Sequence, residues 1–436
     1  MLEIFDGIHW ILVIYLLAAV MAAWIMIGGL MPKIKTWLAN RQVCRIDIND
    51  DLALTKTSIK GAPLLMALRK NGIHIPSPCN NKGTCKQCRI KFKGNAPEVT
   101  AADRVAFDLS MLKEGWRLAC QAKVNGDMHL HLDPQTFKVR EFSGTVISND
   151  NVSTFIKELV IKLPAGEEID YQPGSYMQFH VPPFKTNSTD WKQTMDPQFY
   201  ADWDKNGMFG LEIDFSHLAT GHASTVCAFS MASYPAEKNI LKFNIRIATP
   251  PLVNGKLTDK IAWGACSSYA FALKPEDKVL FSGPYGDAFM INDDRDVVFL
   301  IGGAGSSFGR SHIMHLFQTE HTKRKVTLWY GARSLKEQIY RDEFEQLAME
   351  NPNFDYHLVL SEPSQEDIQG GWQPQDPLKT NMLFRAFEAG ELKQRQSTQN
   401  CLFYVCGPPM HNQSVMKLLA DYRVPRENIV LDDFGI

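Results

Sequence analysis

Four cysteines are the residues of this chain whose types and spacing most clearly indicate chemistry. Cys79, Cys85 and Cys88 lie in one short polar loop, and Cys120 follows in a separate segment. Four thiolates grouped in this way suit a [2Fe–2S] cluster, which gives and accepts electrons one at a time. The alternative is a zinc site, but zinc sites usually combine two C-x2-C-type turns, and only Cys85 and Cys88 form such a pair here. The pattern therefore favours an iron–sulfur centre with these four cysteines as metal ligands.

The segments around the cysteine loop predict a small mixed domain. Residues 44–49 alternate between apolar and polar side chains, which predicts a strand, and residues 63–70 read as a helix that ends before Gly72. Gly83 and Thr84 are small, so the loop backbone can wrap closely and point its N–H groups at the sulfur atoms. The loop resembles a ferredoxin of the β-grasp type, although its first gap is one residue longer than the plant-type spacing.

The composition is that of a globular chain with room for about three domains. The chain has 436 residues, of which 45% are hydrophobic and 22% charged, and its net charge is −2. Such a balance gives no global basic field for binding nucleic acid, so no nucleic-acid partner is expected. The cysteines outside the cluster pattern are scattered and odd in number, which is typical of a reducing compartment rather than of a disulfide framework. They are Cys44, Cys227, Cys266, Cys401 and Cys406.

The N-terminal segment predicts a membrane anchor. Residues 8–31 are apolar apart from His9 and carry no charge, and about 20 such residues span a bilayer as a helix. Lys33, Lys35 and Arg41 follow, which predicts a single pass with the bulk of the chain on the cytoplasmic side of a bacterial inner membrane. The alternative is a cleaved signal peptide, but the stretch is too long for an h-region and lacks a basic n-region.

Short strands separated by turn residues follow from residue 140 and predict an antiparallel barrel. The expected strands are residues 142–147, 155–163, 176–181 and 239–248. An insertion rich in aromatic residues and aspartate, residues 184–222, interrupts them. It is expected to be an extended surface segment that serves either as a lid or packing loop or as a docking surface for a partner.

Two motifs in this region resemble the flavin signatures of ferredoxin-NADP reductases. The string from Ala228 to Pro235 resembles R-x-Y-S, which implies that the ring of Phe229 lies on the isoalloxazine of FAD and that the Ser230 hydroxyl reaches its N5 edge. The string Gly264-Ala265-Cys266-Ser267-Ser268-Tyr269 resembles G-x-C-S. It implies a helix N-terminus under the FAD pyrophosphate, with Gly264, Ser267 and Ser268 as contacts.

One position departs from the flavin signature. The arginine of R-x-Y-S would stand at position 227, where this chain has Cys227, so a bidentate phosphate contact is missing there. Arg246 matches the cation that the same reductases use for the nucleotide part, and it is the residue expected to supply the charge. The other outcome left open is a weakly held or empty flavin site.

Strand and helix patterns alternate from residue 295 and predict a parallel α/β domain. The expected strands are residues 297–301, 325–330, 354–360, 401–405 and 429–431. Gly302, Gly303 and Gly305 follow the first of them and precede a helix. Glycines at such a turn let the backbone approach the pyrophosphate of a dinucleotide, which predicts NADH contacts at these residues.

The C-terminal segment carries two further candidates. Cys406, Gly407 and Pro408 resemble the C-G-P-P motif of the same reductases, which implies that Cys406 lies beside the nicotinamide and that its neighbours contact NADH. The alternative for Cys406 is a small buried hydrophobe. Phe434 stands near the C-terminus, where the resemblance implies an aromatic ring that covers the flavin until nicotinamide displaces it; the alternative is a plain C-terminal strand. Ser230, Cys406 and Phe434 are thus the candidate catalytic residues.

The whole order of segments resembles the F subunits of the sodium-translocating NADH:quinone oxidoreductases, in which a ferredoxin is fused to a ferredoxin-NADP-reductase-type module, and residues 186–197 resemble their chlamydial branch. The expected parts are an N-terminal transmembrane helix at residues 1–37, a β-grasp [2Fe–2S] ferredoxin domain at 38–137, an antiparallel β-barrel FAD domain at 138–290 and a parallel-sheet α/β NADH domain at 291–436. The resemblance implies hydride transfer from NADH to FAD, then single electrons through the cluster to partner membrane subunits and, indirectly, to quinone.

Two other functions stay open on the sequence. The chain could be a membrane-tethered NADH reductase component of an oxygenase, since such reductases carry the same three modules. It could also be a scaffold whose flavin site has been lost with the arginine at position 227. The predicted membrane helix has no internal Asp, Glu, Lys or Arg, so sodium movement would use partner subunits. Electron transfer between the predicted domains is expected to involve domain motion.

Overall fold

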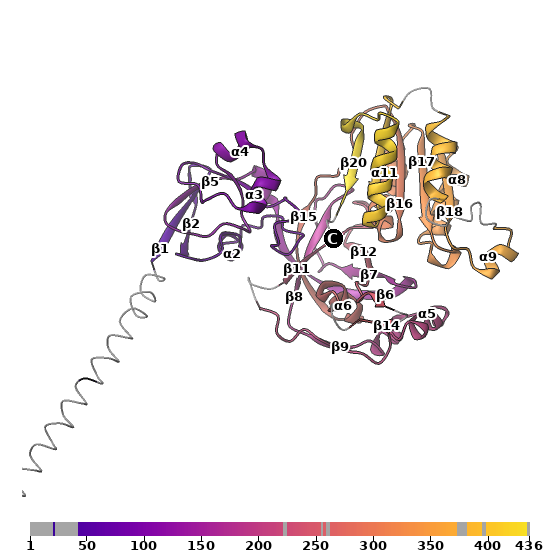
Figure 1. Cartoon of the computed structure of the whole chain (residues 1–436), viewed down its shortest axis with the longest axis horizontal. Coiled ribbons are helices and arrows are strands. Elements are labelled where there is room, and N and C mark those ends of the chain that lie inside the picture. The colour runs from indigo at the N-terminus through magenta and orange to yellow at the C-terminus, as the bar shows by residue number, and fades with distance from the viewer. Residues whose placement is uncertain are drawn as a thin grey trace, which may run out of the picture. The chain divides into compact units, whose positions relative to one another are not determined.

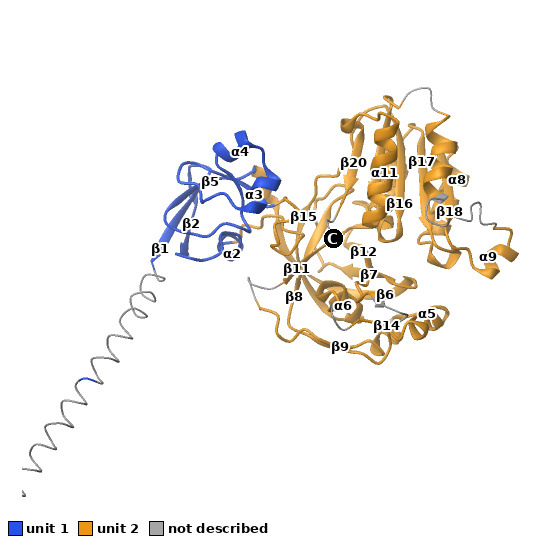
Figure 2. Ribbon diagram, viewed as in Figure 1, with its two compact units in different colours: residues 1–71, 88–133 blue, residues 72–87, 134–436 orange. Residues whose placement is uncertain are grey.

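The computed structural model describes residues 42–220, 225–253, 256–258, 262–372, 382–394 and 398–433, together with Met21. The chain forms two compact units, shown in Figure 2. The first comprises the residues up to Asn71 and Cys88–Asp133, and the second comprises Gly72–Gln87 and the chain from Pro134 onward. Apart from Met21, the predicted membrane anchor lies outside the described residues. Within the described part, no helix is both long and apolar enough to cross a bilayer.

The first unit is built on a mixed five-stranded sheet with the order β2-β1-β5-β3-β4. Its strands are β1 (Val43–Ile48), β2 (Asp51–Ile59), β3 (Arg89–Phe92), β4 (Trp116–Leu118) and β5 (Met128–His131), and its helices are α2 (Leu64–Lys70), α3 (Ala101–Ala106) and α4 (Leu109–Lys113). β1 runs parallel to β5, and the other pairs are antiparallel. The predicted strand at 44–49 and helix at 63–70 are confirmed to within a residue, because alternating residues such as Ile46 and Ile48 are buried as expected.

The first large sheet of the second unit has six antiparallel strands, and it confirms the predicted barrel. The order is β11-β8-β15-β6-β7-β12, and a bridge between Met231 and Phe243 joins the two ends. The strands are β6 (Arg140–Ser153), β7 (Ile156–Lys162), β8 (Tyr176–Val181), β11 (Thr225–Ser230), β12 (Ile240–Arg246) and β15 (Lys278–Tyr285). Phe179, Phe243 and Phe281 fill the interior, and helix α6 (Ala265–Ala272) packs against it.

The insertion folds onto the barrel around its own aromatic cluster. It contains β9 (Lys185–Asn187) paired with β10 (Glu212–Asp214), the short helices η2 (Asp190–Thr194) and η3 (Pro197–Phe199), and α5 (Tyr200–Lys205). Trp191 and Trp203 are buried against Phe271 of α6. The indole N–H of Trp203 donates to the Thr154 carbonyl at 2.6 Å. These contacts support the packing role among the two predicted for the insertion. A small hairpin, β13 (Leu252–Val253) and β14 (Lys256–Leu257), follows β12.

A parallel sheet with helices on both faces completes the second unit (Figure 1) and confirms the predicted α/β domain. The order is β18-β17-β16-β19-β20, from β16 (Asp296–Gly302), β17 (Val326–Ala332), β18 (Phe354–Leu360), β19 (Cys401–Cys406) and β20 (Ile429–Asp432). The helices are α7 (Ser306–Gln318), α8 (Arg341–Glu350), α9 (Gln365–Gln369), α10 (Met382–Phe387) and α11 (Pro409–Asp421). Because β16 is apolar on both faces, Phe299 packs with α7 while Leu300 packs with α11.

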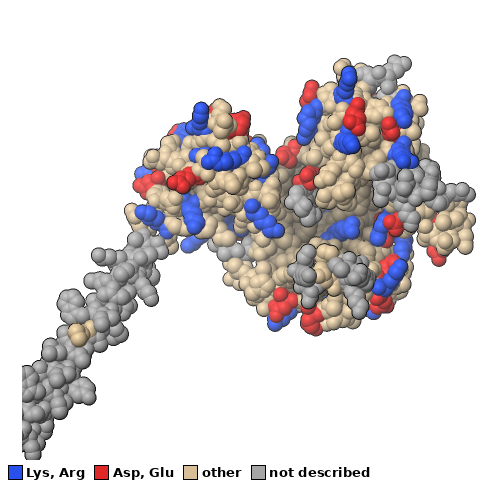
Figure 3. All heavy atoms as spheres, in the orientation of Figure 1, with Lys and Arg blue, Asp and Glu red and all other residues tan. Residues whose placement is uncertain are grey.

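The strand order reverses between β16 and β19, and this is where open α/β sheets bind ligands at the carboxyl ends of their strands. The glycine-rich turn follows β16, and Cys406 ends β19, so both predicted nucleotide motifs reach the switch point. On the face of the molecule seen in Figure 3, basic and acidic side chains are mixed over each unit, as the net charge of −2 suggests.

Candidate functional site

The two nucleotide motifs touch each other. Gly303 has φ +56°, a left-handed conformation that glycine adopts at little cost. A Cβ atom on Gly305 would lie 2.2 Å from the carbonyl oxygen of Cys406 and 3.2 Å from its sulfur. The glycine therefore lets the turn before α7 lie directly against the end of β19. The structure thus brings together motifs that lie about 100 residues apart in the sequence.

A half-buried histidine, His411, packs behind both motifs. A Cβ on Gly302 would lie 3.3 Å from Nδ1 of His411, and one on Gly407 would lie 2.8 Å from its Cδ2. Burial lowers the pKa of His411 to about 4, so this imidazole is neutral at physiological pH. Pro408 precedes α11 as its N-terminal flanking residue. The groups that pack behind the glycine turn are therefore neutral, so they do not neutralise the charge of a bound ligand.

Three side chains from three strands converge at the barrel side of this turn. The hydroxyl of Ser230, at the end of β11, donates to Oδ2 of Asp432 at 3.0 Å. The Cys406 thiol approaches the same carboxylate oxygen at 3.7 Å. Burial and the neighbouring Asp432 hold the pKa of the Cys406 thiol well above its usual value, so it stays protonated. Burial, with Asp287 and Asp433 nearby, raises the pKa of Asp432 to about 7, although its bonds to Ser230 and Cys406 act the other way.

Asp432 is the functional residue that sequence reasoning missed. It stands within the C-terminal segment, in which the sequence motifs single out Phe434 alone. The signal was available in the expected parallel pairing of the last two strands, because β19 and β20 place Cys406 and Asp432 as direct partners. Phe434 itself lies outside the described residues.

The first turn of α6 is shaped for a ligand that accepts hydrogen bonds. Gly264 precedes the helix, and a Cβ there would lie 2.8 Å from Cβ of Ala248, so only glycine fits. The Ser267 hydroxyl accepts from the Ala248 N–H at 3.0 Å and donates to the Gly264 carbonyl at 3.2 Å, so it braces the turn. The Ser268 hydroxyl is buried and has no partner among the described residues. An orphaned donor at a helix N-terminus fits an anionic group such as a pyrophosphate.

Arg246 provides a cation for the same kind of ligand. It ends β12, and its side chain is exposed. Surrounding protein lowers its pKa, as does the nearby Arg333, while Glu337 opposes them. Phe229 is partly buried and meets Phe179 edge-to-face at 5.1 Å, so the orientation of its ring is fixed. These residues fit a phosphate-bearing flavin.

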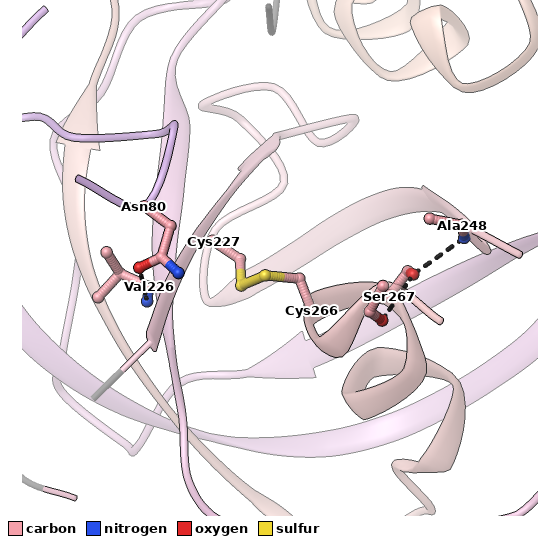
Figure 4. Close-up of a disulfide and its surroundings, with 7 residues drawn as sticks. Asn80, Val226, Cys227, Ala248, Cys266 and Ser267 are labelled. Atoms are coloured by element: carbon pink, nitrogen blue, oxygen red, sulfur yellow. Dashed lines mark hydrogen bonds between the residues drawn. A yellow bond between two sulfur atoms is a disulfide. The ribbon is translucent and has the colours of Figure 1, made fainter. Parts of the chain in front are cut away.

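Cys227, which stands in place of the expected arginine, forms a disulfide with Cys266 (Figure 4). The pair is 39 residues apart in the chain, with Cα atoms 5.8 Å apart. Two of the cysteines expected to be scattered are therefore joined, because the barrel brings β11 beside the first turn of α6. The other described cysteines form no disulfide.

The cysteine loop contributes residues to both units. Cys79 and Cys85 lie in the second unit, with their sulfur atoms 3.2 Å apart. The Cys85 thiol and backbone N–H groups of Thr84 and Cys85 lower the pKa of Cys79, although burial opposes them. These amides point at sulfur as predicted. Positive φ values at Asn80, Asn81, Gly83 and Lys86 give the loop its tight course.

Cys88 and Cys120 belong to the first unit. Cys88 is fully buried, its carbonyl accepts from the Ala119 N–H at 2.7 Å, and Gln121 donates to the sulfur of Cys120 at 3.3 Å. Among the described residues no group of three or more His, Cys, Asp or Glu could hold a single metal ion. A [2Fe–2S] cluster takes two protein ligands on each iron, so the close pair of Cys79 and Cys85 fits one iron of such a centre.

A buried arginine ties the barrel to the parallel sheet next to this site. The Arg310 side chain is only 3% exposed. It donates twice to Glu237 at 2.8 and 2.9 Å, to Glu343 at 2.8 Å and to the Ala232 carbonyl at 2.9 Å. The serines that begin α7 bond Asn244 of β12 at 2.9 and 3.0 Å. Direct hydrogen bonds thus join the barrel that carries the flavin motifs to the parallel sheet that carries the nucleotide motifs.

Removal of this arginine is expected to destabilise the second unit. Arg310→Ala leaves Glu237 with Lys242 as its remaining cation, and breaking such a buried pair costs about 3 kcal/mol. The free energy of unfolding, measured in urea, tests this. As the matched control, Arg341→Ala removes an exposed pair with Glu345 and is expected to cost less than about 1 kcal/mol. Equal losses in the two variants would contradict the assignment.

Comparison with known proteins places these modules in a known class. Residues 48–125 match the 2Fe-2S iron-sulfur cluster binding domain, and residues 299–416 match the Oxidoreductase NAD-binding domain. The fold is similar to that of the cytochrome P450 reductase GcoB of Amycolatopsis, at 19% identity and a TM-score of 0.58. It is also similar to the ferredoxin reductase in carbazole 1,9a-dioxygenase, at 17% and 0.55. Each comparison covers 90% of this chain and 98% of the other. The chain is an iron–sulfur reductase whose cofactors are a [2Fe–2S] cluster, FAD and NADH.

Curated relatives identify the family within this class. The F subunit of the Na(+)-translocating NADH-quinone reductase of Chlamydia pneumoniae is 55% identical over 392 residues, which are 90% of each chain. That of Chlamydia caviae is 50% identical over 430 residues, 99% of each chain, and that of Neisseria gonorrhoeae is 39% identical over 401 residues, 92% of this chain and 94% of the other. The chain belongs to the family of the F subunits of Na(+)-translocating NADH-quinone reductases, rather than to the oxygenase reductases that share its fold.

Proposed function

We propose that this chain is the electron-input subunit of a sodium-translocating NADH:quinone oxidoreductase. In this role it oxidises NADH and passes single electrons through its [2Fe–2S] cluster to partner membrane subunits, which reduce quinone. The observation that carries the proposal is the convergence of Ser230, Cys406 and Asp432 beside the glycine turn at the switch point of the parallel sheet. The family relationship supports the sodium and quinone part of the role.

The barrel residues would hold the flavin in a defined pose. When bound, FAD exchanges two electrons with NADH and one at a time with an iron–sulfur centre. Phe229 would present its ring to the flavin, and Ser230, oriented by Asp432, would present its hydroxyl to the flavin edge. Gly264, Ser267 and Ser268 would place the α6 N-terminus at the pyrophosphate, with Arg246 neutralising charge. The orphaned Ser268 hydroxyl supports this placement.

The parallel sheet would bind NADH at its switch point. Gly302, Gly303 and Gly305 would bring backbone to the pyrophosphate, and Gly407 and Pro408 would line the nicotinamide side next to Cys406. Since the Cys406 thiol stays protonated, it would contribute a neutral S–H contact and no nucleophile. Phe434 would cover the flavin face in the absence of nicotinamide.

Cys79, Cys85, Cys88 and Cys120 would hold the cluster, and all four lie within the segment that matches the iron–sulfur domain. The proposed domains are the anchor at 1–37, the ferredoxin domain at 38–137, the FAD domain at 138–290 and the NADH domain at 291–436. Residues 8–31 would cross the bacterial inner membrane once, in contact with lipid and with the other subunits. Motion between the domains stays a prediction.

The function is tested with the purified full chain and with membranes. The chain is expected to show the absorption of both FAD and a [2Fe–2S] cluster, and both should be reduced by NADH. Assembled with its partner subunits, it is expected to support NADH-dependent quinone reduction that rises when sodium is added. Reduction of an oxygenase but of no quinone would contradict the proposal, and absence of flavin absorption would support the scaffold alternative.

The Ser230–Asp432 pair predicts a pH dependence. Because the pKa of Asp432 is raised to about 7, its carboxyl is neutral below that pH and negatively charged above it, next to the hydroxyl that Ser230 would present to the flavin. A flavin that accepts a hydride gains negative charge, so a charged carboxylate nearby would oppose the transfer. The rate of flavin reduction by NADH is expected to fall as the pH rises through about 7. The free energy of unfolding is also expected to fall as the pH rises, because the folded chain binds this proton more tightly than the unfolded chain does. The contribution is fully present below the unfolded pKa of about 4 and is lost as the pH rises to about 7.

Rapid-mixing measurements between pH 5 and 9 would check this dependence. Asp432→Asn is expected to flatten the profile near pH 7, since an amide does not titrate there. Asp433→Asn removes an exposed neighbouring charge and should shift the inflection slightly downward without abolishing it. An unchanged profile in Asp432→Asn would assign the proton to another group.

A further inference from the structure

The Cys227–Cys266 disulfide joins the two elements that carry the flavin motifs. Cys227 lies on β11, two residues before Phe229, and Cys266 is the second residue of α6, next to Ser267. Figure 4 shows the disulfide between the strand and the first turn of the helix. It also shows the hydrogen bond from the Ala248 N–H to the Ser267 hydroxyl on the other side of that turn. The Cα separation of 5.8 Å is usual for cysteines that can be bridged without backbone movement.

The turn is therefore held from two sides by different means. On one side, the Gly264 N–H donates to the Ala248 carbonyl at 2.9 Å, and the Ser267 hydroxyl accepts from the Ala248 N–H at 3.0 Å. On the other side, the disulfide is the direct covalent link to β11. Within the sheet β11 pairs along its length with β8, and its other edge meets β12 only through the bridge between Met231 and Phe243, so that edge is held weakly. A bond here fixes the turn relative to Phe229 and Ser230.

The two cysteines differ in exposure. Cys227 is 3% exposed and packs in the barrel core, whereas Cys266 lies at its margin and is partly exposed. A thiolate from solution can therefore attack the Cys266 sulfur and release Cys227 as the leaving group, the usual course of thiol–disulfide exchange. A thiol in solution can therefore reduce this disulfide without unfolding of the barrel core.

We propose that Cys227 and Cys266 form a reversible thiol–disulfide pair that sets how tightly the α6 turn holds FAD. The disulfide stands where the flavin signature has a phosphate-binding arginine, and it replaces a charge contact with a covalent restraint on the helix N-terminus. This inference rests on the proposed assignment of α6 to the FAD pyrophosphate. In a chain that also carries free thiols, such a disulfide is more often regulatory than structural, because reducing compartments keep most thiols free.

The exchange balances with a protein dithiol or dithiothreitol as reductant. Its two thiols give two electrons and two protons, the Cys227–Cys266 bond breaks, both cysteines become thiols, and the reductant becomes a disulfide. Hydrogen peroxide reverses the change, since it takes the two electrons and two protons and leaves as two molecules of water. Reduction frees the α6 turn from β11, and the bound pose of FAD then has to be ordered at a cost in affinity.

The test compares the two redox forms of the purified full chain. Maleimide labelling under denaturing conditions, followed by mass spectrometry, is expected to find Cys227 and Cys266 unlabelled after peroxide treatment and both labelled after dithiothreitol. FAD binding to flavin-stripped chain, measured by quenching of flavin fluorescence, is expected to weaken about tenfold in the reduced form. Cys227→Ser and Cys266→Ser are each expected to match the reduced form and to ignore dithiothreitol.

A matched control separates this pair from other thiols. Cys401→Ala removes a buried cysteine of β19 that is in no disulfide, and it is expected to keep the full dithiothreitol response. Equal FAD affinity in the two labelled forms would overturn the inference alone, as would free thiols at both positions after peroxide. Failure of both forms to bind FAD would instead refute the proposed flavin site, and the inference with it.

Discussion

The variant Cys85→Ala is expected to lose the [2Fe–2S] cluster and, with it, quinone reduction. The sulfur of Cys85 lies 3.2 Å from that of Cys79, so its loss leaves one iron with a single protein ligand from this pair. Changes to groups that merely support metal ligands cost about 10- to 100-fold in affinity or activity, so a lost ligand should cost at least about 100-fold in quinone reduction. NADH-dependent reduction of ferricyanide, which can take electrons from flavin directly, should change by less than about twofold.

Absorption spectra of the purified variant and quinone reduction in the assembled complex measure the two effects separately. Cys44→Ala is the matched control, because Cys44 is a buried free cysteine of β1 and not a proposed ligand. It should keep the cluster and the quinone activity. A cluster that survives in Cys85→Ala would show that another group ligates the iron, whereas loss of ferricyanide reduction would show that the substitution disturbs the flavin site.

Elements with local signals could be predicted from the sequence. The strand at residues 297–301 is visible there because both its faces are apolar, and the structure buries it between two helical layers. The strand at 239–248 is visible because it alternates, and β12 occupies most of that range. Motifs that join a strand to a helix, such as Gly302 to Gly305, can be placed for the same reason: one short stretch holds the whole signal.

Contacts between distant segments could not be predicted in this way. Cys227 and Cys266 are 39 residues apart, and nothing in either string reveals that the barrel closes between them. Arg310 and Glu237 are 73 residues apart, and their ion pair depends on how α7 packs on the barrel. The aromatic residues of the insertion are visible in the sequence, but what they pack against is not. Such residues can be buried against the same chain or can form a docking surface for a partner. Asp432 escapes notice since its role depends on the register of β20 beside β19.

Residues from two separate motifs meet at one carboxylate, and this is the strongest support for a joint flavin and nicotinamide site. Ser230 belongs to a flavin motif, Cys406 to a nucleotide motif, and Asp432 to neither, yet one carboxylate oxygen accepts from both of the first two. A flavin and a nicotinamide must meet face to face for hydride transfer, so the residues of the two motifs have to converge. A barrel and a parallel sheet that served unrelated ligands would have no reason to share this carboxylate.

The variant Gly305→Ala is expected to lose most of its use of NADH while it keeps its other cofactors. The added methyl would lie 2.2 Å from the carbonyl oxygen and 2.7 Å from the carbonyl carbon of Cys406, and neither backbone atom can swing aside as a side chain would. The turn and the end of β19 must therefore move apart. A displacement of about 1 Å in a positioning element can cost about 100-fold in rate, so kcat/KM for NADH should fall by about that factor.

Steady-state kinetics with NADH and ferricyanide measure this loss, and absorption spectra show whether FAD and the cluster are retained. Gly370→Ala is the matched control in the same parallel-sheet domain: its Cβ would meet carbonyl oxygens at 3.4 Å, an ordinary contact, and its φ of −75° suits alanine. It should leave kcat/KM unchanged. If Gly305→Ala used NADH as well as the unaltered chain does, the turn against Cys406 would not be the nucleotide site, and the binding place of NADH would have to be sought elsewhere on the sheet edge.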